Sequence, residues 1–207
     1  MLKQSTLITT AVLSLLAPSV TASDRLNEAL QPTAEPVTLN NPPQTESTPL
    51  VEAAEHSVVC SNCTEEEHLV LKALQERGIT DRNALAVILG NIQQESKFDP
   101  IICEGGARTG YHGCHQGGFG LIQFTSIHRY NGLGSYASKN GLDPNDIETQ
   151  IQYVFTEREW LEAEKGFRRE GQSVDYYMKY AYRWLGWGIH GARTHYSYQY
   201  SGKLSHQ

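Results

Sequence analysis

The sequence lacks an excess of positive charge, an internal repeat and a convincing membrane span. Its 17 Lys and Arg residues are outnumbered by 23 Asp and Glu residues, which gives a formal net charge of −6. Nucleic acid is therefore not an expected partner, because binding its phosphates requires clustered positive charge. The apolar stretch within residues 1–22 is short and rich in Thr and Ser, so it is a poor membrane span. Once this stretch is cleaved off as an export signal, we expect no stable membrane span.

Residues 1–22 have the organisation of an export signal. A basic residue, Lys3, precedes an apolar core, and residues 20–22 (Val-Thr-Ala) offer small side chains at a cleavage site. We expect a signal peptide, with a retained N-terminal anchor as the alternative. We therefore expect a secreted or periplasmic protein; a protein associated with a virion is a further alternative.

Residues 23–59 are poor in the side chains that build a hydrophobic core. They contain five prolines among Thr, Glu, Asn and Ala residues and no Phe, Tyr or Trp. Such a segment buries too little apolar surface to offset its conformational entropy. We therefore predict a disordered Pro/Thr/Glu-rich linker or pro-segment here, and a single compact domain over residues 60–207.

Hydrophobic periodicity and capping residues predict that this domain is mainly α-helical. The first helix is expected at residues 65–77, because Thr64 and Glu67 fit a capping box and Gly78 can end the helix. Residues 101–118 are rich in Gly, Cys and His, which indicates a hairpin or an irregular loop. The remaining helices are expected at residues 81–96, 126–139, 144–164 and 173–184.

One glutamate lies on the apolar stripe of the second helix. Ile88, Ile92 and Glu95 are spaced i, i+4 and i+7, so their side chains project from one helical face. A carboxyl group on that face is partly desolvated, which raises its pKa and lets it keep a proton near neutral pH. Glu95 is thus a candidate proton donor to a leaving glycosidic oxygen; the alternative is a solvated carboxylate at a helix end.

Two short motifs at a compatible spacing carry a family resemblance. Residues 95–100 read Glu-Ser-Lys-Phe-Asp-Pro, and residues 118–124 read Gly-Phe-Gly-Leu-Ile-Gln-Phe. With these motifs the chain resembles the lysozyme-like superfamily, most closely domains of the phage tail lysozyme type, over roughly residues 64–200. The resemblance implies an α+β lysozyme-like fold, a helical domain whose small hairpin or loop lobe borders the cleft. It also implies muramidase cleavage of peptidoglycan glycan strands, with Glu95 as catalytic acid.

Glu104 is the candidate second carboxylate. Glycosidases normally use two, about 5 to 5.5 Å apart for retention and roughly 6.5 to 9.5 Å apart for inversion. Glu104 follows Glu95 by nine residues in a Gly-rich turn, so a hairpin can bring it across the cleft, and we predict inverting hydrolysis.

Two other functions stay open. Without a second carboxylate the enzyme would resemble a lytic transglycosylase, which uses a single glutamate. Residues 181–183 read Ala-Tyr-Arg, which departs from the Ala-Tyr-Asn motif of such transglycosylases. The other alternative is a lysozyme-like module that only binds glycan or has a structural role.

The four cysteines predict two disulfide bonds. One pair precedes the first helix and the other brackets the loop after the predicted acid. An export signal and an even count favour disulfides. A cross pairing is a rival, and a structural zinc site that adds His112 or His115 to the thiolates is a further alternative. We expect no metal, and the favoured pairs are Cys60 with Cys63 and Cys103 with Cys114.

Amide and aromatic side chains are the candidates for substrate binding. Gln123 matches the family position whose amide reaches into the cleft, although helix capping is its alternative role. Phe119 belongs to the same run, and Thr125 is the expected N-cap of the following helix. Flat rings pack well on sugars, and the aromatic candidates along the Gly-rich C-terminal chain are Trp187, His190 and Tyr196.

The C-terminal part of the chain is its basic part. Residues 166–207 hold six basic and two acidic side chains, against nine and fifteen in residues 64–165. A local basic and aromatic surface suits an anionic polymer such as bacterial peptidoglycan, with an ordinary solvated surface as the alternative. We therefore expect peptidoglycan as the partner, no cofactor and a monomer.

Overall fold

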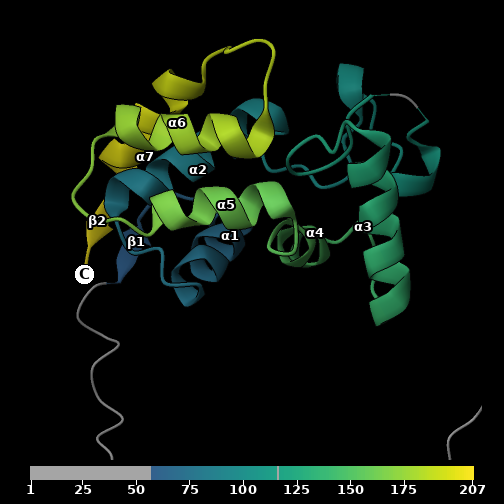
Figure 1. The fold of residues 1–207 in the computed structure, drawn as a ribbon, viewed down its shortest axis with the longest axis horizontal. Helices are drawn as coiled ribbons and strands as arrows, with labels where there is room; N and C mark the ends of the chain where they lie inside the picture. The colour runs from purple at the N-terminus through teal and green to yellow at the C-terminus, as the bar shows by residue number, and fades with distance from the viewer. Residues whose placement is uncertain (1–56, 116) are drawn as a thin grey trace, which may run out of the picture. The chain divides into compact units, whose positions relative to one another are not determined.

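The computed structural model describes residues 57–115 and 117–207. This part of the chain is mainly helical, with one small antiparallel sheet (Figure 1), so the predicted α+β class is confirmed. The predictions for residues 1–22 and for most of residues 23–59 lie outside the described residues. Within the described ranges no helix is long and apolar enough to cross a membrane.

The elements run from a strand near residue 58 to a strand at the C-terminus, and these two strands pair. Val58 lies opposite His206 in the antiparallel register. Val58 and Val59, which the sequence placed at the end of the linker, therefore belong to the folded domain. The elements are β1 (Val58–Cys60), α1 (Glu65–Glu76), α2 (Arg82–Glu95), α3 (Ile127–Asn140), α4 (Ile147–Val154), α5 (Arg158–Phe167), α6 (Val174–Leu185), α7 (Arg193–Lys203) and β2 (Leu204–His206).

Capping side chains start the helices close to where they were predicted. The hydroxyl of Thr64 accepts from the backbone N–H of Glu67, and the Glu67 carboxylate accepts from that of Thr64, so the capping box is confirmed. Asp81 caps α2 through its carboxylate. Ser126 caps α3 in place of the predicted Thr125, whose hydroxyl donates to a loop carbonyl two residues before it.

The segment predicted as one helix over residues 144–164 forms two helices. Residues 155–157 separate α4 from α5, and the backbone there makes i→i+3 hydrogen bonds that turn the chain. The turn places Trp160 in the core and leaves Leu161, expected in the apolar stripe, 43% exposed. It also directs Glu157 into a buried ion pair with α3, a tertiary contact that periodicity along the chain does not reveal.

Helix α2 lies at the centre of the core and packs tightly on α7. Residues 84–92 are all buried, and α1, α6 and α7 all contact this helix. At the crossing with α7, a Cβ added to Gly90 would lie 2.5 Å from the backbone nitrogen of Ser197. Helix α7 was not predicted, because its buried face consists of Arg193, Ser197 and Tyr200, a set that hydrophobic periodicity does not detect.

The chain between α2 and α3 forms the predicted irregular loop region. It has isolated bridges from Ile102 to Arg108 and from Cys103 to Phe119, with short 3-10 turns between them. Figure 1 shows this region and α3 beside α4, apart from the cluster of α1, α2, α5, α6 and α7. The loop region therefore forms a small lobe next to the helical part.

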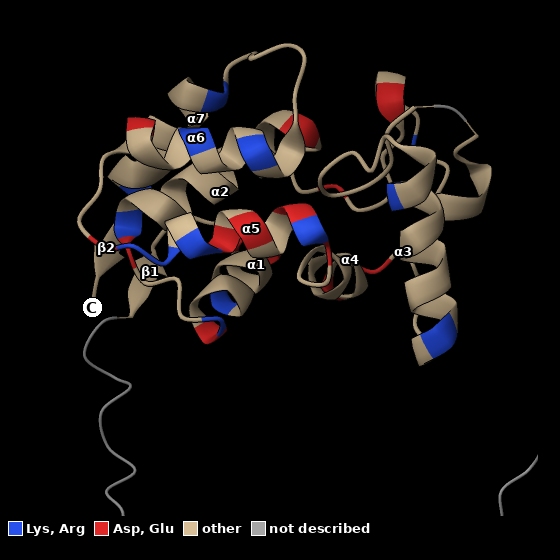
Figure 2. Ribbon diagram, in the orientation of Figure 1, with Lys and Arg blue, Asp and Glu red and all other residues tan. Residues whose placement is uncertain are grey.

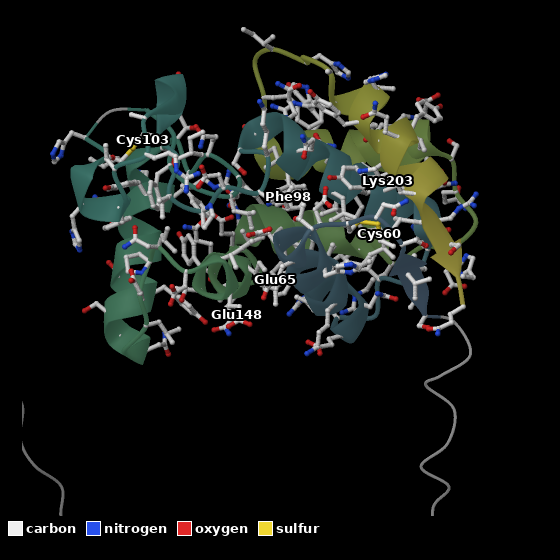
Figure 3. All side chains as sticks on the ribbon, turned by 180° about the vertical axis from the view of Figure 1, so that it is seen from behind. Cys60, Glu65, Phe98, Cys103, Glu148 and Lys203 are labelled. Atoms are coloured by element: carbon white, nitrogen blue, oxygen red, sulfur yellow. A yellow bond between two sulfur atoms is a disulfide. The ribbon has the colours of Figure 1, made fainter. Side chains whose placement is uncertain are left out.

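The cysteines pair as the sequence favoured. One disulfide joins Cys60 to Cys63 between β1 and α1, and the other joins Cys103 to Cys114 within the loop lobe. Figure 3 labels one cysteine of each bond, in separate parts of the domain. The two bonds use the four thiols that the alternative zinc site would require.

Candidate active site

A cleft of about 580 Å³ opens at the C-terminal end of α2. Its walls come from the end of α2, the loop that leads into α3, the end of α6 with the loop after it, and the start of α7. Apolar walls with a few converging polar groups are typical of ligand sites of this size. The lining residues include Glu95, Gln123, Arg129 and Arg193 among the polar ones and Ile122, Leu185, Trp187 and Ile189 among the apolar ones.

Glu95 is held at the wall of this cleft by an ion pair with Arg193. The Arg193 Nη2 atom lies 2.8 Å from Glu95 Oε1, and the two side chains are 6% and 15% exposed. The guanidinium also lies over the Trp187 ring, 4.7 Å from its centroid. The Gln94 side chain accepts a hydrogen bond from the backbone of Ala192 at 2.8 Å, which ties the start of α7 to the end of α2. The carboxyl group is therefore fixed between two packed helices.

The pKa of Glu95 is raised above the ordinary glutamate value. Burial is the largest cause, because it penalises the charged form, and the positive charges of Arg193 and Arg129 oppose it. Burial likewise lowers the pKa of Arg193, while Glu95 acts in the opposite direction. The carboxyl group can thus hold a proton at a higher pH than an exposed glutamate, as the helical face predicted, and a guanidinium lies ready to stabilise it when the proton leaves.

A second ion pair braces the other side of the cleft. The Nε and Nη2 atoms of Arg129 lie 2.6 and 2.5 Å from the two carboxylate oxygens of buried Glu157. Such a bidentate pair fixes the guanidinium plane. The remaining nitrogen of Arg129, Nη1, makes no hydrogen bond to any residue that the structure describes. It is therefore available to a ligand.

Gln123 lies in the cleft wall with its backbone in the left-handed region, at φ 52°. Its Nε2 atom donates to the carbonyls of Gly120 at 3.0 Å and Ile102 at 3.4 Å, so the amide braces the loop and does not cap α3. Its side-chain oxygen accepts no hydrogen bond from the described residues. A non-glycine residue in this conformation costs on the order of 1 kcal/mol and is common at functional sites.

Glu104 does not line the cleft. Its side chain is exposed and accepts a hydrogen bond from the backbone N–H of Gly118 at 3.1 Å. Among the cleft-lining residues within the described ranges, Glu95 is the one that carries a carboxyl group. The structure therefore does not bring the two predicted carboxylates together in the cleft.

The ring of Phe119 is fully buried, which corrects the expectation that it contacts substrate. It packs edge-on against Tyr111 and Tyr130, with ring centroids 5.5 and 6.0 Å away. Phe119 thus anchors the loop lobe from inside. Phe119 occupies its place in the motif because it packs in the core. The sequence alone could not decide this, since an apolar side chain between glycines is compatible with a core position as well as with a cleft wall.

The three C-terminal aromatic candidates take different places. Trp187 lines the cleft, whereas His190 is exposed and is not among the lining residues; its ring centroid lies 6.0 Å from that of Trp187. Tyr196 lies on α7 beside His195 and does not line the cleft. The expectation that Tyr196 forms a cleft wall assumed irregular chain at this point, and the helix removes it from the wall.

Two cleft residues, Arg129 and Arg193, were missed from the sequence. Arg129 follows the N-cap Ser126 in the first turn of α3, and Arg193 begins the unpredicted α7. Neither stands in a motif or a periodic pattern. Their importance arises from ion pairs with glutamates that are distant in the sequence.

Comparison with known families gives the site its context. The family model described as phage tail lysozyme matches residues 65–186, more than half of the chain. The chain belongs to this family. The match confirms the resemblance that the two motifs indicated, and it suggests a lysozyme-like domain that hydrolyses peptidoglycan. It runs from α1 to α6 and so includes Glu95, whereas Arg193 lies beyond it. No curated protein and no solved structure matches the chain.

Proposed function

We propose that the domain is a muramidase that cleaves the peptidoglycan glycan strand with Glu95 as general acid. The observation that carries this proposal is the half-buried carboxyl group of Glu95, with its raised pKa, at the wall of an open cleft. A protonated carboxyl group there can transfer its proton to the glycosidic oxygen as the bond to the sugar breaks. Membership of the phage tail lysozyme family supports the same chemistry.

Arg193 stabilises the charge that this proton transfer leaves on Glu95, and Gln123 helps to bind the sugar. When Glu95 loses its proton, the negative charge develops 2.8 Å from the Arg193 guanidinium. The interaction with Arg193 is a hydrogen bond to a neutral carboxyl group before transfer and becomes an ion pair after it. It therefore strengthens as the proton leaves, which favours the transition state over the bound substrate. The side-chain oxygen of Gln123, which accepts no hydrogen bond from a described residue, can accept one from a sugar hydroxyl. The Trp187 ring offers an apolar face to a sugar.

Glu104 remains our proposal for the second carboxylate, with the role of orienting and deprotonating the attacking water. Its exposed position in the disulfide-closed loop means that the loop has to carry it toward the cleft when substrate binds. A second candidate, the single-glutamate route of a transglycosylase, is favoured by the single carboxyl group among the described lining residues. In that route Glu95 acts first as acid and then as base, and the sugar's own hydroxyl closes an anhydro ring.

The substitution Glu95→Gln tests the proposal. It preserves size and hydrogen-bonding capacity but removes the titrating proton, so clearing of a turbid peptidoglycan suspension should slow by about two to four orders of magnitude. Circular dichroism should show an unchanged helical fold. The matched control is Glu76→Gln, because Glu76 on α1 is 65% exposed and lies outside the cleft; it should clear the suspension at the parental rate.

Glu104→Gln and product masses separate the two routes. Hydrolysis with Glu104 as base predicts reducing sugar ends from the parent and strongly reduced turnover in the variant. Anhydro-sugar ends together with full activity of Glu104→Gln would establish the transglycosylase instead. Parental activity of Glu95→Gln would contradict both routes, because each requires the Glu95 proton. Failure of the parent to clear the suspension would instead leave a module that binds glycan without cleaving it.

A further inference from the structure

A second hollow adjoins the cleft and shares part of its wall. This hollow has a volume of about 470 Å³. Because both cavities have lining residues in common, they lie next to each other on the surface. The shared residues are Ser126, Arg129, Leu185 and Gly186.

The hollow carries charged groups that the proton transfer at Glu95 does not use. Arg158 and Glu159 come from the start of α5, and Arg183 comes from the end of α6. Figure 2 shows acidic and basic residues close together along α5 and basic residues on α6. The walls of the hollow therefore present both signs of charge, beside the aromatic rings of Tyr153 and Trp184.

Arg183 is a basic group in the wall of the hollow that forms no ion pair with a described residue. Its guanidinium lies over the Tyr180 ring, 5.2 Å from the centroid, and it pairs with no carboxylate among the described residues. At the wall shared with the cleft, the Nη1 atom of Arg129 likewise makes no hydrogen bond to a described residue, while Glu157 fixes the rest of that guanidinium. Two donors suited to a carboxylate therefore border the same hollow. Glu159, which is 45% exposed and only loosely paired with Arg158 at 3.6 Å, offers an acceptor for an amine.

We infer that this hollow binds the peptide substituent of a glycan strand whose sugar lies in the cleft, an inference that rests on the proposed function. A peptide with free carboxylates and amines requires binding groups of both signs. A strand stripped by an amidase keeps its hydroxyl groups and a carboxylate on each muramic acid, but it has no amine. Arg129 lines both the cleft that contains Glu95 and the hollow, so a substituent on a sugar beside Glu95 has the hollow next to it. The hollow thus selects peptide-bearing strands.

The test compares two forms of one substrate. Soluble peptidoglycan strands are cleaved before and after an amidase has removed their peptides, and new ends are quantified by mass. We expect the parent to have a kcat/KM about five- to tenfold higher on the peptide-bearing strands. Arg183→Ala should remove most of that preference by raising KM on peptide-bearing strands, with unchanged kinetics on stripped strands. The control is Lys179→Ala, which removes a positive charge one turn earlier on α6 at an exposed position outside the hollow.

A second readout does not require cleavage. Binding of the Glu95→Gln protein to intact and to stripped peptidoglycan is measured by co-sedimentation, with and without Arg183→Ala. Weaker binding to stripped material, and loss of that difference on Arg183→Ala, support the inference. Equal kinetics and equal binding of the two substrates, or an equal loss on both in Arg183→Ala, would overturn it. Peptide-dependent binding without cleavage by the parent would contradict the proposed function while leaving the hollow assigned.

Discussion

At the scale of single residues, the decisive contact is the ion pair between Glu95 and Arg193. Burial and the positive charge of Arg193 act on the pKa of Glu95 in opposite directions, and burial is the larger cause. The net result is a carboxyl group that is easier to protonate than an exposed one, yet whose charged form has a partner at 2.8 Å. A general acid needs both properties within one catalytic cycle.

The substitution Arg193→Gln should move the pH profile of the enzyme. It removes the positive charge while the site stays buried, so the pKa of Glu95 should rise further. Because Glu95 donates its proton, activity is lost as the pH rises through this pKa, and that alkaline limb should shift to higher pH. The measurement is kcat/KM against pH on peptidoglycan strands, with Arg193→Lys as the control that keeps the charge. An alkaline limb in the same place for Arg193→Gln would mean that another group controls the profile.

At the scale of elements, the packing of α2 on α7 positions the site. The helices approach so closely at Gly90 that any side chain there would meet the backbone of Ser197. This crossing lies about one turn from Glu95 at the end of α2 and one turn from Arg193 at the start of α7. A shift between the two helices would therefore lengthen the ion pair and open one wall of the cleft.

The substitution Gly90→Ala should destabilise the domain and reduce its activity together. The added Cβ would lie 2.5 Å from a backbone nitrogen that cannot move alone, and such overpacking costs about 1 to 3 kcal/mol. The matched control is Gly202→Ala in α7, where a Cβ meets no atom within 4 Å; it should stabilise the domain by about 0.5 to 1 kcal/mol. Urea unfolding measures both free energies. Equal stabilisation by the two substitutions would show that the helices can separate at no cost.

At the scale of the whole molecule, Glu164 of α5 joins distant parts of the chain. Its carboxylate accepts from Arg77 after α1 at 2.8 Å and from Arg168 at 3.0 Å, and its side chain is 7% exposed. Burial alone would raise the pKa of Glu164, but the hydrogen bonds from Arg77 and Arg168 outweigh burial and lower it. The stability that Glu164 contributes is therefore complete above the ordinary glutamate value of 4.5 and is lost as the pH falls through the lowered pKa.

Glu164→Gln should thus destabilise the domain at neutral pH and change its free energy of unfolding little at acidic pH. At pH 7 the free energy of unfolding in urea should fall by about 1 to 3 kcal/mol relative to the parent. The gap should close as the pH is lowered, since the parent then loses the same interactions. Glu76→Gln serves as the exposed control and should change stability little at either pH. A gap that persists unchanged in acid would show that packing, not charge, accounts for the loss.

The sequence by itself determined the features that depend on neighbouring residues. Thr64 and Asp81 set the starts of two helices because capping is a contact over three residues. The spacing of Ile88, Ile92 and Glu95 placed the carboxyl group on a buried face, because helical geometry alone decides which side chains share a face. The two motifs indicated the family for a similar reason, because each is a short run of neighbouring residues that can be recognised without knowing the tertiary structure.

Only the tertiary structure decided what surrounds Glu95. Helix α7 buries a polar face, so hydrophobic periodicity could not predict it. Its Arg193 reaches Glu95 only because α2 and α7 approach closely at Gly90. The break between α4 and α5 and the burial of Phe119 likewise follow from contacts with distant segments. Local spacing fixes which way a side chain leaves its own helix. The partner that it meets, and hence the charge and shape of the cleft, depends on how helices far apart in the sequence pack together.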